Sequence, residues 1–154
     1  MLSFAYGSNM NWDQMRERCP SSCFVGIAVL RDHKLAFTRE SVNHHCGVAD
    51  VVAVDGEEVW GVVYEIDDLD VGKLDTKEGF FPGRDKNAYH RRECLVFLDG
   101  ENQRPFTVFA YFGDPQPNPP LPNAAYKTLI LAGARHWHLP EEYIRGLEQI
   151  EISG

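Results

Sequence analysis

A four-residue segment directly after the apolar run at positions 2–5 is the first candidate binding site in the chain: Tyr6, Gly7, Ser8 and Asn9. Where a strand breaks into a Gly-Ser-Asn turn and then enters a helix, several backbone N–H groups point toward one position near the helix N-terminus. Negative charge is favoured there, and the space suits a carboxylate as well as a phosphate. The simpler interpretation is an ordinary strand-to-helix turn in which Ser8 or Asn9 is the N-cap.

Glu78 is the strongest candidate for proton transfer. It lies where a helix that starts at Asp67 or Asp68 is expected to end, and Gly79 then turns the chain. At a helix C-terminus the dipole disfavours an anion and raises the pKa of a carboxyl group. A glutamate with a raised pKa can act as a general base near neutral pH. The alternative is a solvated glutamate beside a helix-terminating glycine.

No common nucleophile motif is present. The sequence contains no Gly-x-Ser-x-Gly, no Walker loop, no dinucleotide-binding glycine pattern and no His-Glu-x-x-His. Ser8 beside an anion site is a conceivable nucleophile, but the sequence places no histidine or lysine next to it. An enzyme built on these residues is therefore expected to use carboxylate chemistry.

Length and charge narrow the function further. The chain has 154 residues, which predicts one domain spanning 1–154. Its formal net charge of -8 argues against nonspecific binding to nucleic acid. No apolar run approaches the ~20 residues that cross a bilayer, and the start of the chain lacks the regions of a signal peptide. We therefore expect a cytoplasmic protein that binds a small molecule or a protein partner.

The cysteines and neighbouring histidines do not follow a recognised metal-binding pattern. Cys19-x3-Cys23 and His44-His45-Cys46 contain residue types that bind zinc, but they lack the paired close spacings of a zinc ribbon. A core of this size does not need disulfides. Four reduced thiols are therefore expected, at Cys19, Cys23, Cys46 and Cys94.

Apolar patterning predicts strands that run in hairpins and a smaller number of helices. Strands are expected at 2–5, 23–30, 33–38, 48–54, 59–64, 89–98 and 107–112. Helices are expected at 10–18, 68–77, 124–135 and 140–150, and 113–122 is a proline-rich internal loop. Asp55-Gly56 and Asp99-Gly100 are typical of hairpin turns. The predicted fold class is α+β, a small mainly antiparallel β-barrel decorated by helices, because barrel closure removes exposed strand edges.

Five segments occur in an order that carries more information than any one of them. They are Tyr6-Gly7-Ser8-Asn9, the run 58–64, Leu74-Asp75-x-x-Glu78-Gly79, Tyr126-Lys127-x-x-Ile130 with Gly133-Ala134, and Leu139-Pro140-x-x-Tyr143. Together they resemble the γ-glutamylcyclotransferase family, including its γ-glutamylamine and antibiotic-pathway relatives. The resemblance covers the chain from Phe4 to Ile150.

This resemblance implies a small β-barrel with helices around it. It also implies conversion of a γ-glutamyl compound to 5-oxoproline, with release of a free amine or amino acid. The first loop would hold the glutamyl carboxylate, and Glu78 would be the catalytic acid/base. Hydroxyl groups that line the pocket are implied at Tyr89, Tyr111 and Tyr126. Because the substrate's own α-amine attacks its γ-carbonyl, no enzyme nucleophile, metal or organic cofactor has a task, and relatives are monomers or homodimers.

The loop 80–87 departs from the animal members of the family because it is longer. Such a loop beside the base is either a lid or an exposed turn whose phenylalanines cover the core. Arg91, at the start of the next strand, is a further candidate for contacting a substrate carboxylate. Two other functions stay open: a regulatory or binding module that keeps the pocket without catalysis, and an enzyme in which water attacks the amide.

Overall fold

Five strands close into a small barrel in the computed structural model, which describes residues 1–99 and 104–153. They are β1 (Leu2–Ala5), β2 (Cys23–Ser41), β3 (Cys46–Glu65), β4 (Tyr89–Leu98) and β5 (Pro105–Gly113), in the order β1-β3-β2-β4-β5. The paired strands are antiparallel except β1 and β5, where Ser3 lies opposite Phe109 in a parallel pairing that closes the barrel. The predicted α+β fold with a mainly antiparallel barrel is therefore confirmed.

The strands β2 and β3 form one long hairpin, and its turn lies at 42–45. The predicted hairpin turn at Asp55-Gly56 is wrong, because the chain on both sides of it pairs with the same strand, β2. Asp32 and Gly56 instead adopt φ angles of 58° and 84°, and the Asp32 side chain accepts a hydrogen bond from the Gly56 N–H at 3.0 Å. A positive φ serves a bulge as well as a turn, so the Asp-Gly pair marks an irregularity within two continuous strands.

The second predicted hairpin, β4 with β5, is confirmed by nine paired positions from Tyr89↔Gly113 to Phe97↔Pro105. Asp99 has a φ of 51°, as a tight turn requires, whereas Gly100 lies outside the described residues. The proline-rich stretch after β5 contains no helix or strand between Asp114 and Asn123.

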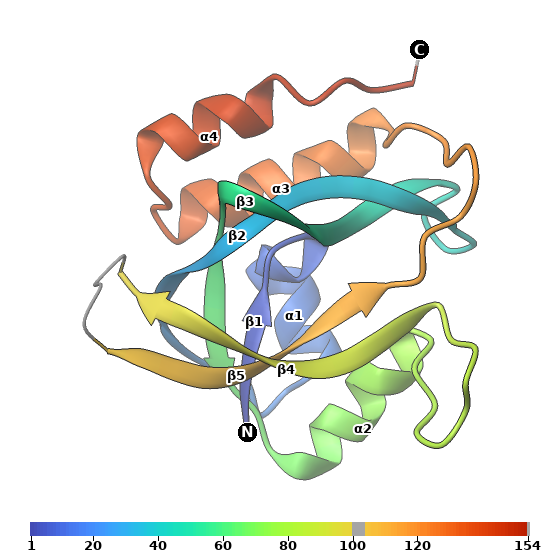
Figure 1. Cartoon of the computed structure of the whole chain (residues 1–154). Helices are drawn as coiled ribbons and strands as arrows, with labels where there is room; N and C mark the ends of the chain where they lie inside the picture. The colour runs from blue at the N-terminus through green and yellow to red at the C-terminus, as the bar shows by residue number, and fades with distance from the viewer. Residues whose placement is uncertain (100–103, 154) are drawn as a thin grey trace.

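Helices cover the barrel on opposite sides (Figure 1). The helices are the short 3-10 turn η1 (Ser8–Met10), α1 (Trp12–Arg18), α2 (Asp68–Lys77), α3 (Ala124–His136) and α4 (Glu141–Glu148). Figure 1 shows α3 and α4 side by side along the β2–β3 hairpin, with α2 at the other end of the barrel. Within the described residues, no helix is long and apolar enough to cross a membrane.

The start of α1 differs from the prediction. Its N-cap is Asn11, whose side chain accepts a hydrogen bond from the Gln14 N–H at 3.1 Å. Neither Ser8 nor Asn9 is therefore the N-cap of this helix. Both residues belong to η1, a separate turn, and their side chains are free for other contacts.

The thiols of Cys19, Cys23, Cys46 and Cys94 are all free. Within the described part of the chain, no three His, Cys, Asp or Glu side chains gather where they could hold a metal ion. The buried interior is instead apolar and aromatic, with Met10, Met15, Tyr64 and Ile130 among its largest fully buried side chains.

Candidate active site

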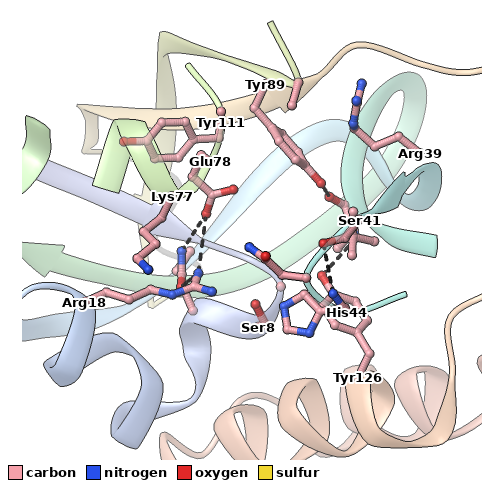
Figure 2. A pocket seen from close by; sticks show the side chains of 18 of the residues that line it. Ser8, Arg18, Arg39, Ser41, His44, Lys77, Glu78, Tyr89, Tyr111 and Tyr126 are labelled. Carbon is pink, nitrogen blue, oxygen red and sulfur yellow. Dashed lines mark hydrogen bonds and ion pairs between the residues drawn. The ribbon is translucent and has the colours of Figure 1, made fainter. Parts of the chain in front are cut away.

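One cavity of about 290 Å³ is lined by all eight residues that the sequence analysis assigned to catalysis and substrate binding through the family resemblance. Its walls come from the first loop (residues 6–9), the ends of α1 and α2, the tip of the β2–β3 hairpin, and aromatic side chains of β4, β5 and α3. Figure 2 shows this cavity from close by. The eight predicted residues that line it are Tyr6, Gly7, Ser8, Asn9, Glu78, Tyr89, Tyr111 and Tyr126.

The first loop is fixed through its carbonyl groups. The Tyr64 hydroxyl donates to the Asn9 carbonyl oxygen at 2.9 Å, and the Trp137 indole N–H donates to the Met10 carbonyl oxygen at 3.0 Å. The backbone of Met10 also touches α3 at Gly133, where an added Cβ would lie 2.4 Å from the Met10 carbonyl carbon. The N–H groups of Ser8 and Asn9 precede the first hydrogen bond of the η1 turn, from the Met10 N–H to the Gly7 carbonyl oxygen at 3.1 Å, so neither has a partner within the turn.

Glu78 is held at the end of α2 by a complete helix-termination motif. It is the C-cap residue, and Gly79 follows with a φ of 68°. The Phe80 N–H donates to the Asp75 carbonyl oxygen at 2.8 Å, and the Gly79 N–H donates to the Thr76 carbonyl oxygen at 3.1 Å. This pair of bonds is the Schellman arrangement, which satisfies the last carbonyl groups of a helix.

The end of α2 is also attached to the barrel through a buried aspartate. One carboxylate oxygen of Asp75 accepts a hydrogen bond from the Tyr111 hydroxyl at 2.7 Å, and the other accepts from Arg91 at 2.8 Å. Because Tyr111 belongs to β5 and Arg91 to β4, two barrel strands fix the helix three residues before Glu78. The position of Glu78 relative to the barrel is therefore fixed by the Asp75 contacts before it and by the Schellman bonds that end the helix after it.

The carboxylate of Glu78 is largely buried, with 18% of its side chain exposed. Its Oε1 accepts a hydrogen bond from the Asn9 side-chain amide at 2.9 Å, and the Arg18 guanidinium lies 4.0 Å from the same oxygen. Burial raises the pKa of Glu78, while the charge of Arg18 and the Asn9 hydrogen bond act in the opposite direction. The sequence predicted a raised pKa from the helix dipole, whereas burial is its largest cause in the structure.

The tyrosine hydroxyls of the cavity have different hydrogen-bonding roles. Tyr6 donates to the Tyr111 carbonyl oxygen, Tyr89 donates to the Ala49 carbonyl oxygen at 2.6 Å, and Tyr111 donates to Asp75. Tyr126 is different because its oxygen accepts a hydrogen bond, from the Ala49 N–H at 3.0 Å. Its hydroxyl also shares a hydrogen bond with the Ser8 side chain, so this pair of hydroxyls keeps one proton that a ligand can accept.

Several lining residues were missed by sequence reasoning. Three cations line the cavity: Arg18, Arg39 and Lys77. His44 lines it as well, with its ring centroid 4.9 Å from that of Tyr126 in an edge-to-face arrangement. Burial lowers the pKa of His44. Figure 2 shows Glu78 and Arg18 on one side of Ser8, with His44 and Tyr126 on the other.

The geometry bears on two further expectations. Arg91 was predicted to contact a substrate carboxylate, but it is paired with Asp75 and is not among the residues lining the cavity. The loop 80–87 does not line the cavity either. It closes on itself through Asn87, whose side chain accepts from the Phe81 N–H and donates to the Arg84 carbonyl oxygen, each at 3.0 Å. This arrangement matches an exposed turn better than a lid.

Known proteins are similar to this chain in sequence and in fold. The model of the AIG2-like family matches residues 58–147. γ-Glutamylcyclotransferases of Bos taurus and Homo sapiens are each 34% identical to the chain, and the matches cover 97% of this chain and 78% of those proteins. A solved structure of a γ-glutamyl cyclotransferase is 32% identical with a TM-score of 0.90, covering 99% of this chain and 89% of that one. The chain therefore belongs to the AIG2-like family, as a γ-glutamylcyclotransferase-like member.

Proposed function

We propose that this chain is a γ-glutamyl cyclotransferase, which converts a small γ-glutamyl amide, amine or peptide to 5-oxoproline and releases the free amine or amino acid. The observation that carries the proposal is the largely buried carboxylate of Glu78, joined to the first loop by the Asn9 hydrogen bond inside one cavity. The relatives named γ-glutamylcyclotransferase, at 34% identity, support the same reaction.

The first loop is the proposed site for the α-carboxylate of the glutamyl group. The N–H groups of Ser8 and Asn9 precede the first hydrogen bond of η1 and provide donors for an anion, and the hydroxyl pair of Ser8 and Tyr126 provides another. Since Asn9 also touches Glu78, an α-ammonium group next to the bound carboxylate would lie near the Glu78 carboxylate. Ser8 then holds the substrate and is not a nucleophile.

The proposed reaction is an intramolecular acyl transfer. Glu78 takes a proton from the α-ammonium group, and the resulting amine attacks the γ-carbonyl carbon to form a five-membered ring. The bond between that carbon and the leaving nitrogen then breaks as Glu78 delivers the proton to the leaving nitrogen. The former α-amine nitrogen, now part of the ring, gives up its second proton to the leaving nitrogen by the same route. The leaving group therefore departs as an ammonium ion, and Glu78 ends as a carboxylate.

Two physical effects would account for most of the rate acceleration. Holding the substrate folded converts ring closure into a reaction between groups already in contact, which lowers its entropic barrier. Burial raises the pKa of Glu78, so its conjugate acid and base are closer in energy near neutral pH than those of a solvated glutamate. Hydrogen-bond donors of the first loop or Tyr126 would also stabilise charge that develops on the carbonyl oxygen.

The direct test is product analysis with purified protein. γ-Glutamyl amino acids, γ-glutamylamines and glutathione are supplied separately, and 5-oxoproline and glutamate are quantified by mass spectrometry. We expect 5-oxoproline from at least one class. A Glu78→Gln variant should lose about 10²–10⁴-fold in kcat, the usual contribution of a general acid or base.

Glu17→Gln is the matched control, because Glu17 is an exposed glutamate of α1 outside the cavity. It should keep the activity of the unmodified chain. Full turnover by Glu78→Gln would contradict the proposed mechanism. Glutamate as the product would indicate attack by water, and thermal stabilisation by 5-oxoproline without turnover of any compound would indicate a binding module.

A further inference from the structure

Two residues of α1 meet the side chain of Asn9 in the first loop. Gln14 and Arg18 lie four positions apart, so they project from the same face of the helix. The Gln14 amide nitrogen donates to Asn9 Oδ1 at 3.0 Å, and Arg18 donates to the same oxygen at 2.9 Å. Gln14 is fixed in turn, since its backbone N–H donates to the N-cap residue Asn11.

These contacts determine which way the Asn9 amide faces. An arginine side chain has donors and no acceptor, so the Asn9 atom beside Arg18 must be the carbonyl oxygen. The amide nitrogen then points to the other side, where it donates to Glu78 Oε1 at 2.9 Å. With the amide reversed, Asn9 would present an acceptor to the Glu78 carboxylate and a donor to Arg18, and both contacts would be repulsive.

Gln14 also orients the hydroxyl group of Ser8. The Gln14 amide nitrogen also donates to the Ser8 hydroxyl oxygen at 2.9 Å, so both of its protons are used. Ser8 therefore accepts from Gln14, and its own proton is left for another acceptor. The polar groups of the first loop are thus oriented from α1, by Gln14 outside the cavity and by Arg18 in its wall.

Arg18 also acts on Glu78 through its charge. Within the described residues it is the ion-pair partner of Glu78, at 4.0 Å. Lys77 of α2 lines the same cavity, and four phenols face it from the first loop, β4, β5 and α3: Tyr6, Tyr89, Tyr111 and Tyr126. Burial raises the pKa of each of these phenols, so they are uncharged near neutral pH. Among the described residues Arg18 is therefore the cation within 4.0 Å of the Glu78 carboxylate, and its charge lowers the pKa that burial raises.

We propose that Gln14 and Arg18 are positioning residues of the active site, which hold the Asn9 amide toward Glu78 and keep Glu78 in the carboxylate form that accepts a proton. This inference rests on the proposed function for its role in the reaction. Neither residue takes up or gives away a proton in the proposed reaction. In the proton-transfer step, Glu78 gains the proton and becomes neutral, while Arg18 keeps its charge throughout.

The test is a pH titration of Glu78 in the Arg18→Gln variant. An opposite charge at this distance lowers the pKa of a carboxyl group by about 1–3 units, so its removal should raise the pKa of Glu78 by a similar amount. The carboxyl group is observed directly by ¹³C NMR with labelled glutamate, assigned by comparison with Glu78→Gln. The acidic limb of kcat/KM should move by the same amount, and activity should recover at high pH.

Arg16→Gln is the matched control, because it removes the same charge from the same helix at an exposed position paired with Asp13. Its Glu78 titration should coincide with that of the unmodified chain. A Glu78 pKa that is the same in Arg18→Gln and Arg16→Gln would overturn the proposal. The NMR titration needs no turnover, so it decides the role of Arg18 even where no 5-oxoproline is formed and the proposed function fails.

A second variant removes the contacts of Gln14 instead of the charge of Arg18. Gln14→Leu removes the donors to Ser8 and Asn9 and leaves the charge of Arg18 in place. We expect a smaller rise in the pKa of Glu78, together with a higher KM because the Ser8 hydroxyl is no longer oriented. If Arg18→Gln does not fold, Gln14→Leu still tests whether α1 orients the first loop. An unchanged Glu78 titration with an unchanged KM would contradict the role of Gln14.

Discussion

The two sides of the cavity differ in the kind of polar group that they present. Next to α1 and α2, Arg18 and Glu78 form an ion pair that is mostly shielded from solvent. Next to α3 and the tip of the β2–β3 hairpin, Tyr126 and His44 are in contact, and burial favours the uncharged form of each. The comparison separates two tasks. We call Arg18 with Glu78 the charged side and Tyr126 with His44 the uncharged side; Arg39 also lines the cavity and belongs to neither pair. In the proposed mechanism, proton transfer belongs to the charged side, and the uncharged side positions a ligand without responding to pH near neutrality.

Tyr126→Phe should have the largest effect on the uncharged side. The change removes a phenol that contacts the Ser8 side chain and leaves the Ala49 N–H without its acceptor. A hydrogen bond to a charged ligand group contributes about 1.5–3 kcal/mol, so kcat/KM should fall by roughly 10–100-fold. The measurement is kcat/KM between pH 5 and 9. A shift in the acidic limb would show that Tyr126 also affects proton transfer and would break the comparison.

Tyr143→Phe is a suitable control for that measurement. Tyr143 also has a buried hydroxyl oxygen, but it lies on α4 outside the cavity. Its substitution should leave both kcat/KM and the pH profile unchanged. Equal losses for the two variants would indicate a general effect on folding.

His44→Ala should have a smaller effect. The edge-to-face contact with Tyr126 is worth about 0.5–1.5 kcal/mol, so its loss should raise KM by roughly 2–10-fold with little change in kcat. The neighbouring variant His45→Ala, at an exposed turn position, is the control. A large fall in kcat instead would place His44 in the chemical step and would again remove the separation between the two sides.

The smallest expected effect concerns stability. The pKa of Glu78 is raised in the folded chain, so the folded state binds more protons than the unfolded state above the ordinary glutamate pKa. The stability contributed by Glu78 is therefore fully present below that ordinary pKa and is lost as pH rises through the folded-state pKa. Glu78→Gln removes the buried anion, so Tm should rise by about 2–4 °C at pH 8.

That gain should shrink toward pH 4, where the carboxyl group is mostly protonated in both states. Differential scanning calorimetry of Glu78→Gln and Glu17→Gln at both pH values measures it. A lower Tm for Glu78→Gln at pH 8 would mean that Asn9 and Arg18 more than offset the burial of the carboxylate. The charged side would then be a source of stability as well as of chemistry.

The parts of the site that were predicted correctly depend on local sequence. The apolar run before Tyr6 predicts a strand that ends at the first loop, and Gly79 predicts the end of α2 because few other residues accept its φ of 68°. The barrel follows from the number of strands and hairpins, and its closure was also predicted. The Tyr126 position was predicted only through the family resemblance.

The parts that were not predicted depend on pairing over long distances. Asp55-Gly56 has the composition of a turn, and only its pairing with β2 reveals a bulge. Because the turn was placed there, the tip of the β2–β3 hairpin at 42–45 was not predicted. The contributions of Arg39 and His44 to the cavity were therefore missed. Arg18 was missed for a similar reason, because its neighbour Glu78 is brought to it by the packing of α1 against α2.

The closed shape of the loop 80–87 has a practical consequence. The Ala88 N–H donates to the Gly79 carbonyl oxygen at 3.1 Å, so the two ends of the loop are joined beside Glu78 whatever lies between them. Gly83 and Arg84 are exposed, and a Cβ added at Gly83 would meet no other atom within 4 Å. A peptide tag or a fluorescent reporter inserted between these two residues should therefore be carried without moving the base. The protein would then report on its own location while the proposed activity is measured.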